Sequence, residues 1–456
     1  MFEVLATAAA PAQAEAADLT GRWEGAIRIG EASIPLVVRV TQGPDGLVAM
    51  MDSPAQNARD IPVAALSETS GVVRFTVPMV GGRFEGARST DGSTWTGTLF
   101  QGAASLPLIL TRTAATAVAA PPPPPIRPQT PVPPFPYAAE DVTFANAGAG
   151  ITLAGTLTLP PGEGPFPAVI LLTGSAAQDR DETILGHKPF AVWADALTRR
   201  GIAVLRYDDR GMGGSGGGSP DETTADFATD AVAAMDFLRA RPEIDAARIG
   251  LMGHSEGGAT ALIAASNGAP AAFVVMIAGP SVSGADILIE QTKQLVLASG
   301  GTEAQALQAE AAQARFMLAV LNNRNDGPAA ARAVEALAIE IGQPAQQAAG
   351  VARAMSSGWY RFFTAYDPAD AIRGLSVPLL AIYAERDRNV PADQNAPHLR
   401  TLKPDAEIVV LPGLNHLMQP ATTGLADEYG TITQTLAPEA ITAVTDWVAR
   451  VTGARP

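Results

Sequence analysis

The chain of 456 residues has no cysteine, few histidines and fewer basic than acidic side chains. Without cysteine it has no disulfide bond, no thiol nucleophile and no thiolate ligand for a metal. The four histidines are scattered along the chain, and none stands at metal-ligand spacing from another. We therefore expect no metal site.

Basic residues number 31 against 46 acidic ones, which gives a formal net charge of −15 at pH 7. A nucleic-acid-binding protein needs a basic surface to neutralise phosphates, so this class is excluded. The same charge disfavours binding to anionic membrane surfaces. No apolar run approaches the ~20 residues of a membrane-spanning helix, and we expect no membrane span.

Residues 1–18 are rich in alanine and end in small residues, like the cleavage end of a secretory signal, but they lack the basic start and a full apolar segment. We expect a signal-peptide remnant, or a misplaced start, on a periplasmic or secreted protein. The alternative is a disordered tail on a cytoplasmic protein.

Short apolar runs separated by Gly, Asp and Pro turns fill residues 19–113, and the Asp-Gly pairs at 45–46 and 91–92 favour hairpins. This pattern predicts a small all-β barrel or sandwich of seven or eight strands. Such a domain either binds a ligand or partner or only stabilises its neighbour. Residues 114–136 are rich in proline, with five in succession at 121–125, and are predicted to form an extended spacer.

Apolar strands and helical segments alternate over residues 137–283 and 376–456, which predicts an α/β domain with a parallel sheet. Residues 284–375 interrupt this alternation. They are rich in Ala, Gln and Glu and are predicted to be helical, with breaks at glycines and at one Asn- and Pro-containing stretch.

The pentapeptide at 253–257 reads Gly-His-Ser-Glu-Gly. A short apolar strand precedes it and a Gly- and Ala-rich helix follows, the context in which the central serine is a nucleophile. The turn strains the backbone of Ser255, and Gly253 and Gly257 leave the room that it needs. We predict that Ser255 is the nucleophile. The alternative is a serine in an ordinary Gly-rich turn.

A serine hydroxyl needs a base, and the base needs an acid that orients it. His416 lies on a loop after an apolar strand and C-terminal to the serine, and is the predicted base. Asp387 follows the apolar strand at 377–384 and is the predicted acid. Glu385 and Asp393 are its rivals, and Asp387 has the alternative of pairing with its neighbouring arginines.

Acyl transfer also requires donors for an oxyanion. We expect one from the amide of Glu256, which follows the nucleophile, and one from the amide of Ser175, in the loop after the apolar run at 166–172. The Glu256 side chain is expected to point away and pair elsewhere. The predicted lining of the substrate pocket is Gly174, His187, His254, Trp359 and Phe363. The aromatic members have the alternative role of anchoring the helical insertion in a core.

The glycine-rich stretch at 211–218 is not predicted to bind a nucleotide. A dinucleotide fingerprint needs its glycines directly after a strand and opening a helix. Here Asp208, Asp209 and Arg210 intervene. We expect Asp208 and Arg210 to form a structural ion pair, and we expect no cofactor.

The chain from Asp141 to Thr452 resembles the α/β-hydrolase superfamily. The resemblance rests on the pentapeptide, on Tyr-Asp-Asp-Arg-Gly-Met-Gly-Gly-Ser at 207–215, and on Leu-Thr-Gly-Ser at 172–175 followed by Gln-Asp-Arg-Asp-Glu at 178–182. It is similar to bacterial carboxylesterases close to the dienelactone-hydrolase-like and serine-aminopeptidase-like members. Thr173 replaces the histidine of the common His-Gly oxyanion motif.

The resemblance implies an eight-stranded, mostly parallel sheet with helices on both faces. It also implies that residues 284–375 form a cap over the nucleophile. Residues 19–113 resemble the lipocalin-like barrel found ahead of some bacterial serine hydrolases.

Together these features predict a serine carboxylesterase that cleaves small, short-chain esters through an acyl-enzyme, using Ser255, His416 and Asp387. A peptidase or amidase with the same triad is the first alternative, in which Glu256 or the loop at 179–182 binds an amine. The second alternative is an inactive protein that binds a ligand or partner.

Overall fold

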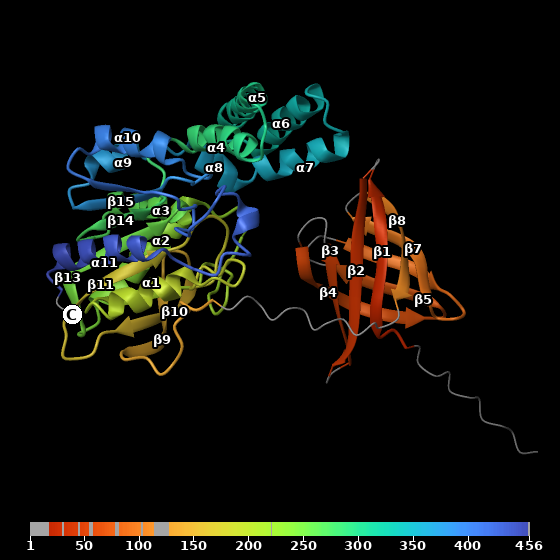
Figure 1. The fold of residues 1–456 in the computed structure, drawn as a ribbon, viewed down its shortest axis with the longest axis horizontal. Helices are drawn as coiled ribbons and strands as arrows, with labels where there is room; N and C mark the ends of the chain where they lie inside the picture. The colour runs from red at the N-terminus through yellow and green to blue at the C-terminus, as the bar shows by residue number, and fades with distance from the viewer. Residues whose placement is uncertain are drawn as a thin grey trace, which may run out of the picture. The chain divides into compact units, whose positions relative to one another are not determined.

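The computed structural model describes residues 18–29, 32–43, 46–53, 58–77, 82–101, 104–113, 127–219 and 221–454. The chain divides into two compact units, one ending at Pro123 and the other beginning at Pro124 (Figure 1). The expected leader up to residue 17 and the five successive prolines lie outside the described residues.

The first unit is a closed antiparallel barrel, so the expected barrel or sandwich is a barrel. Consecutive strands pair, and the first strand closes onto the last. Trp23 stacks on Trp95 inside, with ring centroids 3.8 Å apart, and both side chains are fully buried. The interior is thus packed with side chains. The strands are β1 Gly21–Ile29, β2 Ala32–Gly43, β3 Gly46–Ser53, β4 Ala58–Thr69, β5 Val72–Val77, β6 Gly82–Arg88, β7 Thr94–Gln101 and β8 Ala104–Thr113.

The second unit is built on an eight-stranded sheet in the order β16-β15-β14-β13-β11-β12-β10-β9. Strand β10 runs antiparallel to both of its neighbours, and all other neighbours are parallel. The expected mostly parallel sheet is confirmed. Its strands are β9 Ala138–Asn146, β10 Ile151–Leu159, β11 Phe166–Leu172, β12 Ala203–Tyr207, β13 Ile244–His254, β14 Val274–Ile277, β15 Leu379–Ala384 and β16 Glu407–Leu411.

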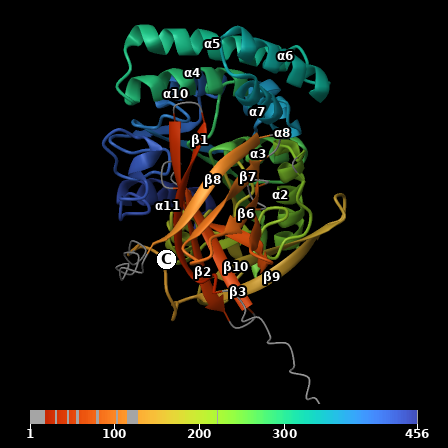
Figure 2. The same ribbon diagram turned by 90° about the vertical axis from the view of Figure 1, so that its right-hand side faces the viewer.

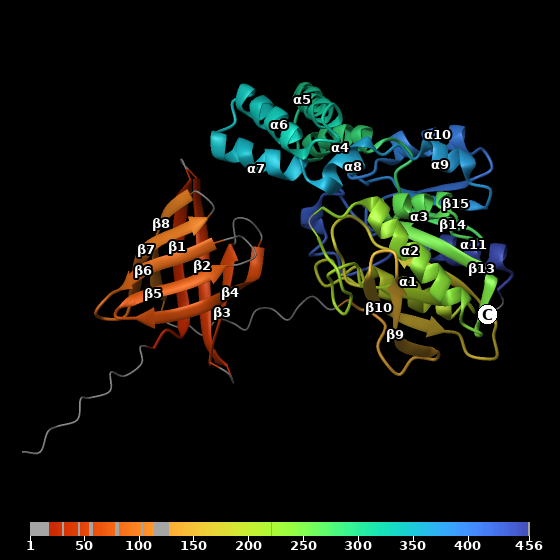
Figure 3. The same cartoon turned by 180° about the vertical axis from the view of Figure 1, so that it is seen from behind.

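Helices cover both faces of this sheet (Figure 3). Helices α1 (Pro189–Thr198) and α11 (Pro438–Thr452) pack on one face. The other face carries α2 Thr224–Arg239, α3 Glu256–Ser266, α9 Ala369–Gly374 and α10 Ala392–Leu402.

Strand β11 shows why a sheet covered by helices on both faces can be predicted from the sequence. Ala168 and Ile170 face one helical layer, Val169 and Leu171 face the other, and all four are buried. A strand buried on both faces is a continuous apolar run in the sequence. Burying each of the larger side chains contributes about 1.5–3 kcal/mol to stability.

Residues 284–375, hereafter the insert, are helical as predicted. Besides α9 they form α4 Gly284–Ala298, α5 Glu303–Leu321, α6 Gly327–Glu340, α7 Ala345–Met355 and α8 Gly358–Ala365. Figure 2 shows α5 and α6 on the outer side of this group, with α4 and α7 beneath them. The insert has its own core, in which Met317 and Val320 of α5 pack with Val334 of α6. Over the described ranges, no helix combines the length and apolar character needed to cross a membrane.

The described end of the proline-rich segment belongs to the second unit. Arg127 donates hydrogen bonds to the carbonyls of Leu185 and Gly430, at 2.8 and 3.0 Å. Gln129 donates to the carbonyl of Leu436 at 2.8 Å and accepts from the amide of the same residue at 2.9 Å. Of the spacer expected over 114–136, the described residues from 127 onward thus include polar side chains that bind backbone groups of the second unit.

Candidate active site

Ser255 stands at the sharp turn between β13 and α3. Its backbone angles, φ 53° and ψ −121°, are strained for a residue that carries a Cβ atom. A Cβ added to Gly253 would lie 2.0 Å from the carbonyl oxygen of Gly257, and one added to Gly257 would lie 2.2 Å from that of Leu172. Glycine alone fits at both positions, so the tight turn predicted around Ser255 is present.

His416 and Asp387 form a buried pair on the loops after β16 and β15. The His416 Nδ1 atom lies 2.8 Å from Oδ2 of Asp387. The other carboxylate oxygen accepts the amides of Asn389 and Val390, both at 2.8 Å. Two backbone donors thus fix Oδ1 of the carboxylate, and Oδ2 orients the imidazole. A catalytic base requires such an orienting acid.

Glu385, the rival acid, and the two arginines next to Asp387 have other partners. Glu385 accepts an amide hydrogen bond at the surface, from the loop that precedes the histidine. Arg386 and Arg388 donate to backbone carbonyls at residues 421 and 423. The contacts therefore favour Asp387 over Glu385 as the partner of the base.

Ser255 and His416 line one pocket of about 340 Å³. Gly174, His254, Trp359 and Phe363, which were predicted to line the substrate pocket, also line this cavity. The remaining lining residues are Ser175, Gln178, Glu182, Ile184, Glu256, Pro280, Ile287, Leu288, Gln291, Asn389, Val390, Leu417 and Tyr429. Within the described part of the chain, no three His, Asp or Glu side chains gather as ligands for a metal.

His187 does not line this pocket, contrary to the prediction. It is buried, with Nδ1 3.0 Å from the hydroxyl of Thr435 and Nε2 3.1 Å from the carbonyl oxygen of Tyr429. Burial lowers the pKa of His187. Both ring nitrogens therefore face partners that lie more than 240 positions away in the sequence. The residues next to His187 in the sequence do not indicate these contacts.

The predicted oxyanion donors belong to two segments that meet at Ser255. Glu256 is the first residue of α3, so its amide has no acceptor within the helix. A Cβ added to Gly174 would lie 3.4 Å from Cβ of Ser255. The Gly174 amide donates to Glu182 at 2.7 Å. The amide of Ser175 has no hydrogen-bond partner among the described residues, which leaves it able to bind a ligand in the pocket.

The Glu256 side chain is buried between helix α2 and helix α8 of the insert. The Thr224 hydroxyl donates to its carboxylate at 2.5 Å, and Nε1 of Trp359 lies 2.9 and 3.0 Å from its two oxygens. Burial raises the pKa of Glu256, and these donors oppose that shift. The carboxylate therefore links the insert to the residue after Ser255.

Replacing Trp359 with phenylalanine is expected to lower the free energy of unfolding by about 1.5–3 kcal/mol. The new ring keeps the stacking on Phe363, whose centroid lies 5.3 Å away. It removes the N–H group and leaves the buried Glu256 carboxylate one donor short. Urea unfolding measures the loss.

Combining Trp359→Phe with Glu256→Gln completes a double-mutant cycle. We expect a coupling of about 0.5–3 kcal/mol between the two positions. Strictly additive losses would contradict a stabilising bond between them.

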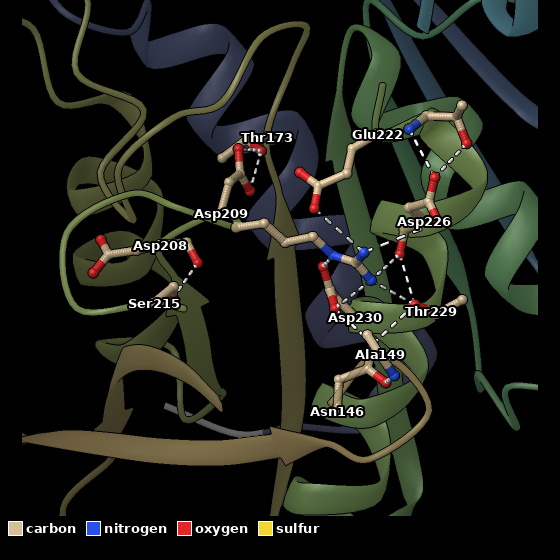
Figure 4. Close-up of polar contacts among 12 residues, drawn as sticks. Asn146, Ala149, Thr173, Asp208, Asp209, Ser215, Glu222, Asp226, Thr229 and Asp230 are labelled. Atoms are coloured by element: carbon tan, nitrogen blue, oxygen red, sulfur yellow. Dashed lines mark hydrogen bonds and ion pairs between the residues drawn. The ribbon is translucent and has the colours of Figure 1, made fainter. Parts of the chain in front are cut away.

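An ion-pair network supports the loop after β12 (Figure 4). The expected pair between Asp208 and Arg210 is wrong. Asp208 binds Arg180 at 2.7 Å, and Arg210 binds the buried Asp230 of α2 at 2.6 Å. Each side chain thus has its partner on a different segment, Asp208 on the loop after β11 and Arg210 on helix α2.

Asp209 lies between these pairs and fixes the loop that carries the predicted oxyanion donor. It accepts the Thr173 hydroxyl at 2.9 and 2.8 Å (Figure 4). It also accepts the amide of Gln178 at 2.8 Å. Burial raises the pKa of Asp209 to about 8. Thr173, which stands where many esterases have histidine, thus anchors this loop to β12.

Comparisons with known proteins agree on the second unit. A family model described as serine aminopeptidase, S33, matches residues 188–419. Esterase EstD of Thermotoga maritima is 29% identical over 290 residues, which cover 63% of this chain and 61% of the esterase. Mitochondrial acyl-coenzyme A thioesterase 2 of Mus musculus is 35% identical over 124 residues, 26% of this chain and 24% of the thioesterase. The chain thus spans about three fifths of EstD and a quarter of the thioesterase.

Among solved structures, the α/β hydrolase GrgF of Penicillium sp. sh18 is similar, with a TM-score of 0.44 and 18% identity over 69% of this chain and 99% of that one. The S33 match covers just over half of this chain and includes Ser255, Asp387 and His416. The chain therefore belongs to the serine aminopeptidase S33 family of α/β hydrolases.

Proposed function

We propose that the protein hydrolyses carboxylic esters through an acyl-enzyme on Ser255. The observation that carries this proposal is that His416, which lines one pocket with Ser255, is bonded to the buried Asp387. Because Asp387 holds Nδ1 of the imidazole, Nε2 remains to take the serine proton. The similarity to an esterase and to a thioesterase supports acyl transfer to water.

In this mechanism Ser255 attacks the ester carbonyl carbon while His416 accepts the hydroxyl proton. The amides of Glu256 and Ser175 bind the oxyanion of the tetrahedral intermediate, where a single donor is worth about 2.7–4 kcal/mol. His416 then gives its proton to the departing alcohol. Water repeats the sequence on the acyl-enzyme and releases the acid.

An ester suits the pocket better than the free N-terminus of a peptide. An aminopeptidase needs a carboxylate that is free to bind the substrate ammonium group. Among the described residues, Glu182 and Glu256 are the acidic ones that line this pocket. Glu182 already binds His254 and an amide, and Glu256 binds Thr224 and Trp359.

We also propose that the insert acts as a cap that limits the acyl chain. Ile287 and Leu288 of α4 and Trp359 and Phe363 of α8 line the pocket together with Ser255. A pocket of about 340 Å³ bounded by these side chains suits short-chain esters.

The test is a series of p-nitrophenyl esters from acetate to palmitate, run beside aminoacyl p-nitroanilides. We expect turnover of the esters with an optimum at short chains, and labelling of Ser255 by a fluorophosphonate, located by peptide mass spectrometry. Faster cleavage of the anilides would favour the peptidase alternative. Absence of both turnover and labelling would favour the inactive binding protein.

A further inference from the structure

A second acid–imidazole pair lies beside the first and has no part in the mechanism above. His254 and Glu182 are both buried, at 6% and 1% exposed. Nδ1 of His254 lies 2.9 Å from Oε1 of Glu182, and its Nε2 lies 3.0 Å from the backbone carbonyl oxygen of His416. The two imidazole rings are neighbours, with centroids 4.8 Å apart.

These contacts determine where protons reside. A neutral imidazole carries one N–H group, whereas both ring nitrogens of His254 face oxygen atoms. The carbonyl oxygen of His416 can only accept. Oε1 of Glu182 already accepts the amide of Gly174 at 2.7 Å, so this oxygen is placed as an acceptor for Nδ1 as well. The arrangement thus fits an imidazolium that donates from both nitrogens.

The pair joins three separate parts of the site. Glu182 binds the amide next to the expected oxyanion donor Ser175. His254 directly precedes Ser255. The carbonyl oxygen that His254 binds belongs to His416 itself. A displacement of about 1 Å among such groups can cost ~10²-fold in rate.

We propose that Glu182 and a doubly protonated His254 are positioning residues, which hold the loop of Ser175 and the loop of His416 in register with Ser255. This inference rests on the proposed function for its catalytic consequence. The protonation state of His254 is independent of that function. Burial alone would lower the pKa of His254, but the charge and hydrogen bond of Glu182 outweigh burial and the pKa is raised.

The charged and titratable groups that face His254 are few. Glu182 contacts Nδ1, and the His416 ring is the neighbouring imidazole. Asp387, which binds the far side of that ring, adds a weaker attraction. Among the described residues, Glu182 is the charged group that contacts a nitrogen of the His254 ring. Removing the charge of Glu182 is therefore the most direct test of the pair.

The first arm of the test counts ring protons by NMR. The full chain has four histidines, so ¹⁵N-labelled rings can be assigned one by one with His254→Gln as the reference. We expect both N–H protons of His254 to persist at pH 8 in the wild type. In Glu182→Gln one of them should be lost at that pH. A wild-type ring with a single proton at pH 8 would overturn the proposal.

The second arm measures ester hydrolysis. Glu182→Gln keeps the shape of the side chain but no longer stabilises the imidazolium, so one contact of His254 is lost at neutral pH. We expect kcat to fall about 10–10²-fold with KM little changed. The ratio of kcat/KM between variant and wild type should rise as the pH falls, because reprotonation of His254 restores its second hydrogen bond.

His187→Gln is the matched control, because His187 is equally buried but does not line the pocket. It should keep kcat even where it lowers stability. If Glu182→Gln has the kcat and the pH profile of the wild type, Glu182 and His254 do not position the catalytic groups, and the proposal is contradicted. Absence of ester hydrolysis in the wild type would overturn the proposed function, while the proton count would still decide the state of His254.

Discussion

Replacing Ser255 with alanine is expected to lower kcat/KM for p-nitrophenyl butyrate by at least about 10³-fold. In the proposed mechanism, the substitution removes the atom that forms the acyl-enzyme. It leaves the proposed oxyanion donors and the pocket, which sustain a small residual rate. Steady-state kinetics on wild type and variant measure the loss.

The Ser255→Ala substitution should not change the backbone strain at position 255. Alanine carries a Cβ atom, as serine does, so the strain at φ 53° is unchanged and the stability of the variant should be close to that of the wild type. Ser299→Ala, at the end of α4 and away from the pocket lining, is the matched control and should keep full activity. A Ser255→Ala variant with most of its activity would rule this serine out as the nucleophile.

Replacing Asp387 with asparagine is expected to lower kcat by about 10⁴-fold at neutral pH. The new side-chain oxygen can still accept the amides of Asn389 and Val390. Its NH₂ group then faces Nδ1 of His416 and donates to it. The proton of the imidazole moves to Nε2, so the ring can no longer accept the serine proton.

Because asparagine preserves the backbone contacts, this variant should fold with nearly wild-type stability, which thermal unfolding can check. Glu385→Gln is its matched control, since Glu385 binds an exposed amide on a neighbouring loop. We expect the control to stay within about twofold of the wild type, as for a surface substitution that touches no reacting group. A larger loss in Glu385→Gln than in Asp387→Asn would reverse the assignment of the acid.

The parts of the site that were predictable follow from local chemistry. The turn around Ser255 needs glycine at positions 253 and 257, and this spacing can be recognised in the sequence alone. Strands such as β11 and β15 are buried on both faces and therefore appear as unbroken apolar runs. Asp387 follows β15, and His416 follows the partly exposed apolar strand β16. Their positions after these strands allowed the sequence to predict them as a pair, and the two side chains are bonded to each other.

The parts that were not predictable depend on contacts between distant segments. The Glu182–His254 bond spans 72 positions, the Glu256–Trp359 bond 103, and the bond from His254 to the carbonyl of residue 416 spans 162. Charged residues have several candidate partners in a sequence, and geometry selects among them. Asp208 and Arg210 illustrate this, since each is paired, but with a residue of another segment.

The sequence by itself thus determined the alternation of strands and helices and the strained turn at Ser255, and it supplied the candidates for nucleophile, base and acid. These depend on backbone conformation and on burial, which leave periodic or short-range patterns. The tertiary structure alone decided that the β domain closes into a barrel, that His187 packs away from the pocket, and that Glu256 and His254 are bonded as they are. The reason is physical: a hydrogen bond or ion pair needs atoms within about 3 Å, and only folding brings such distant residues that close.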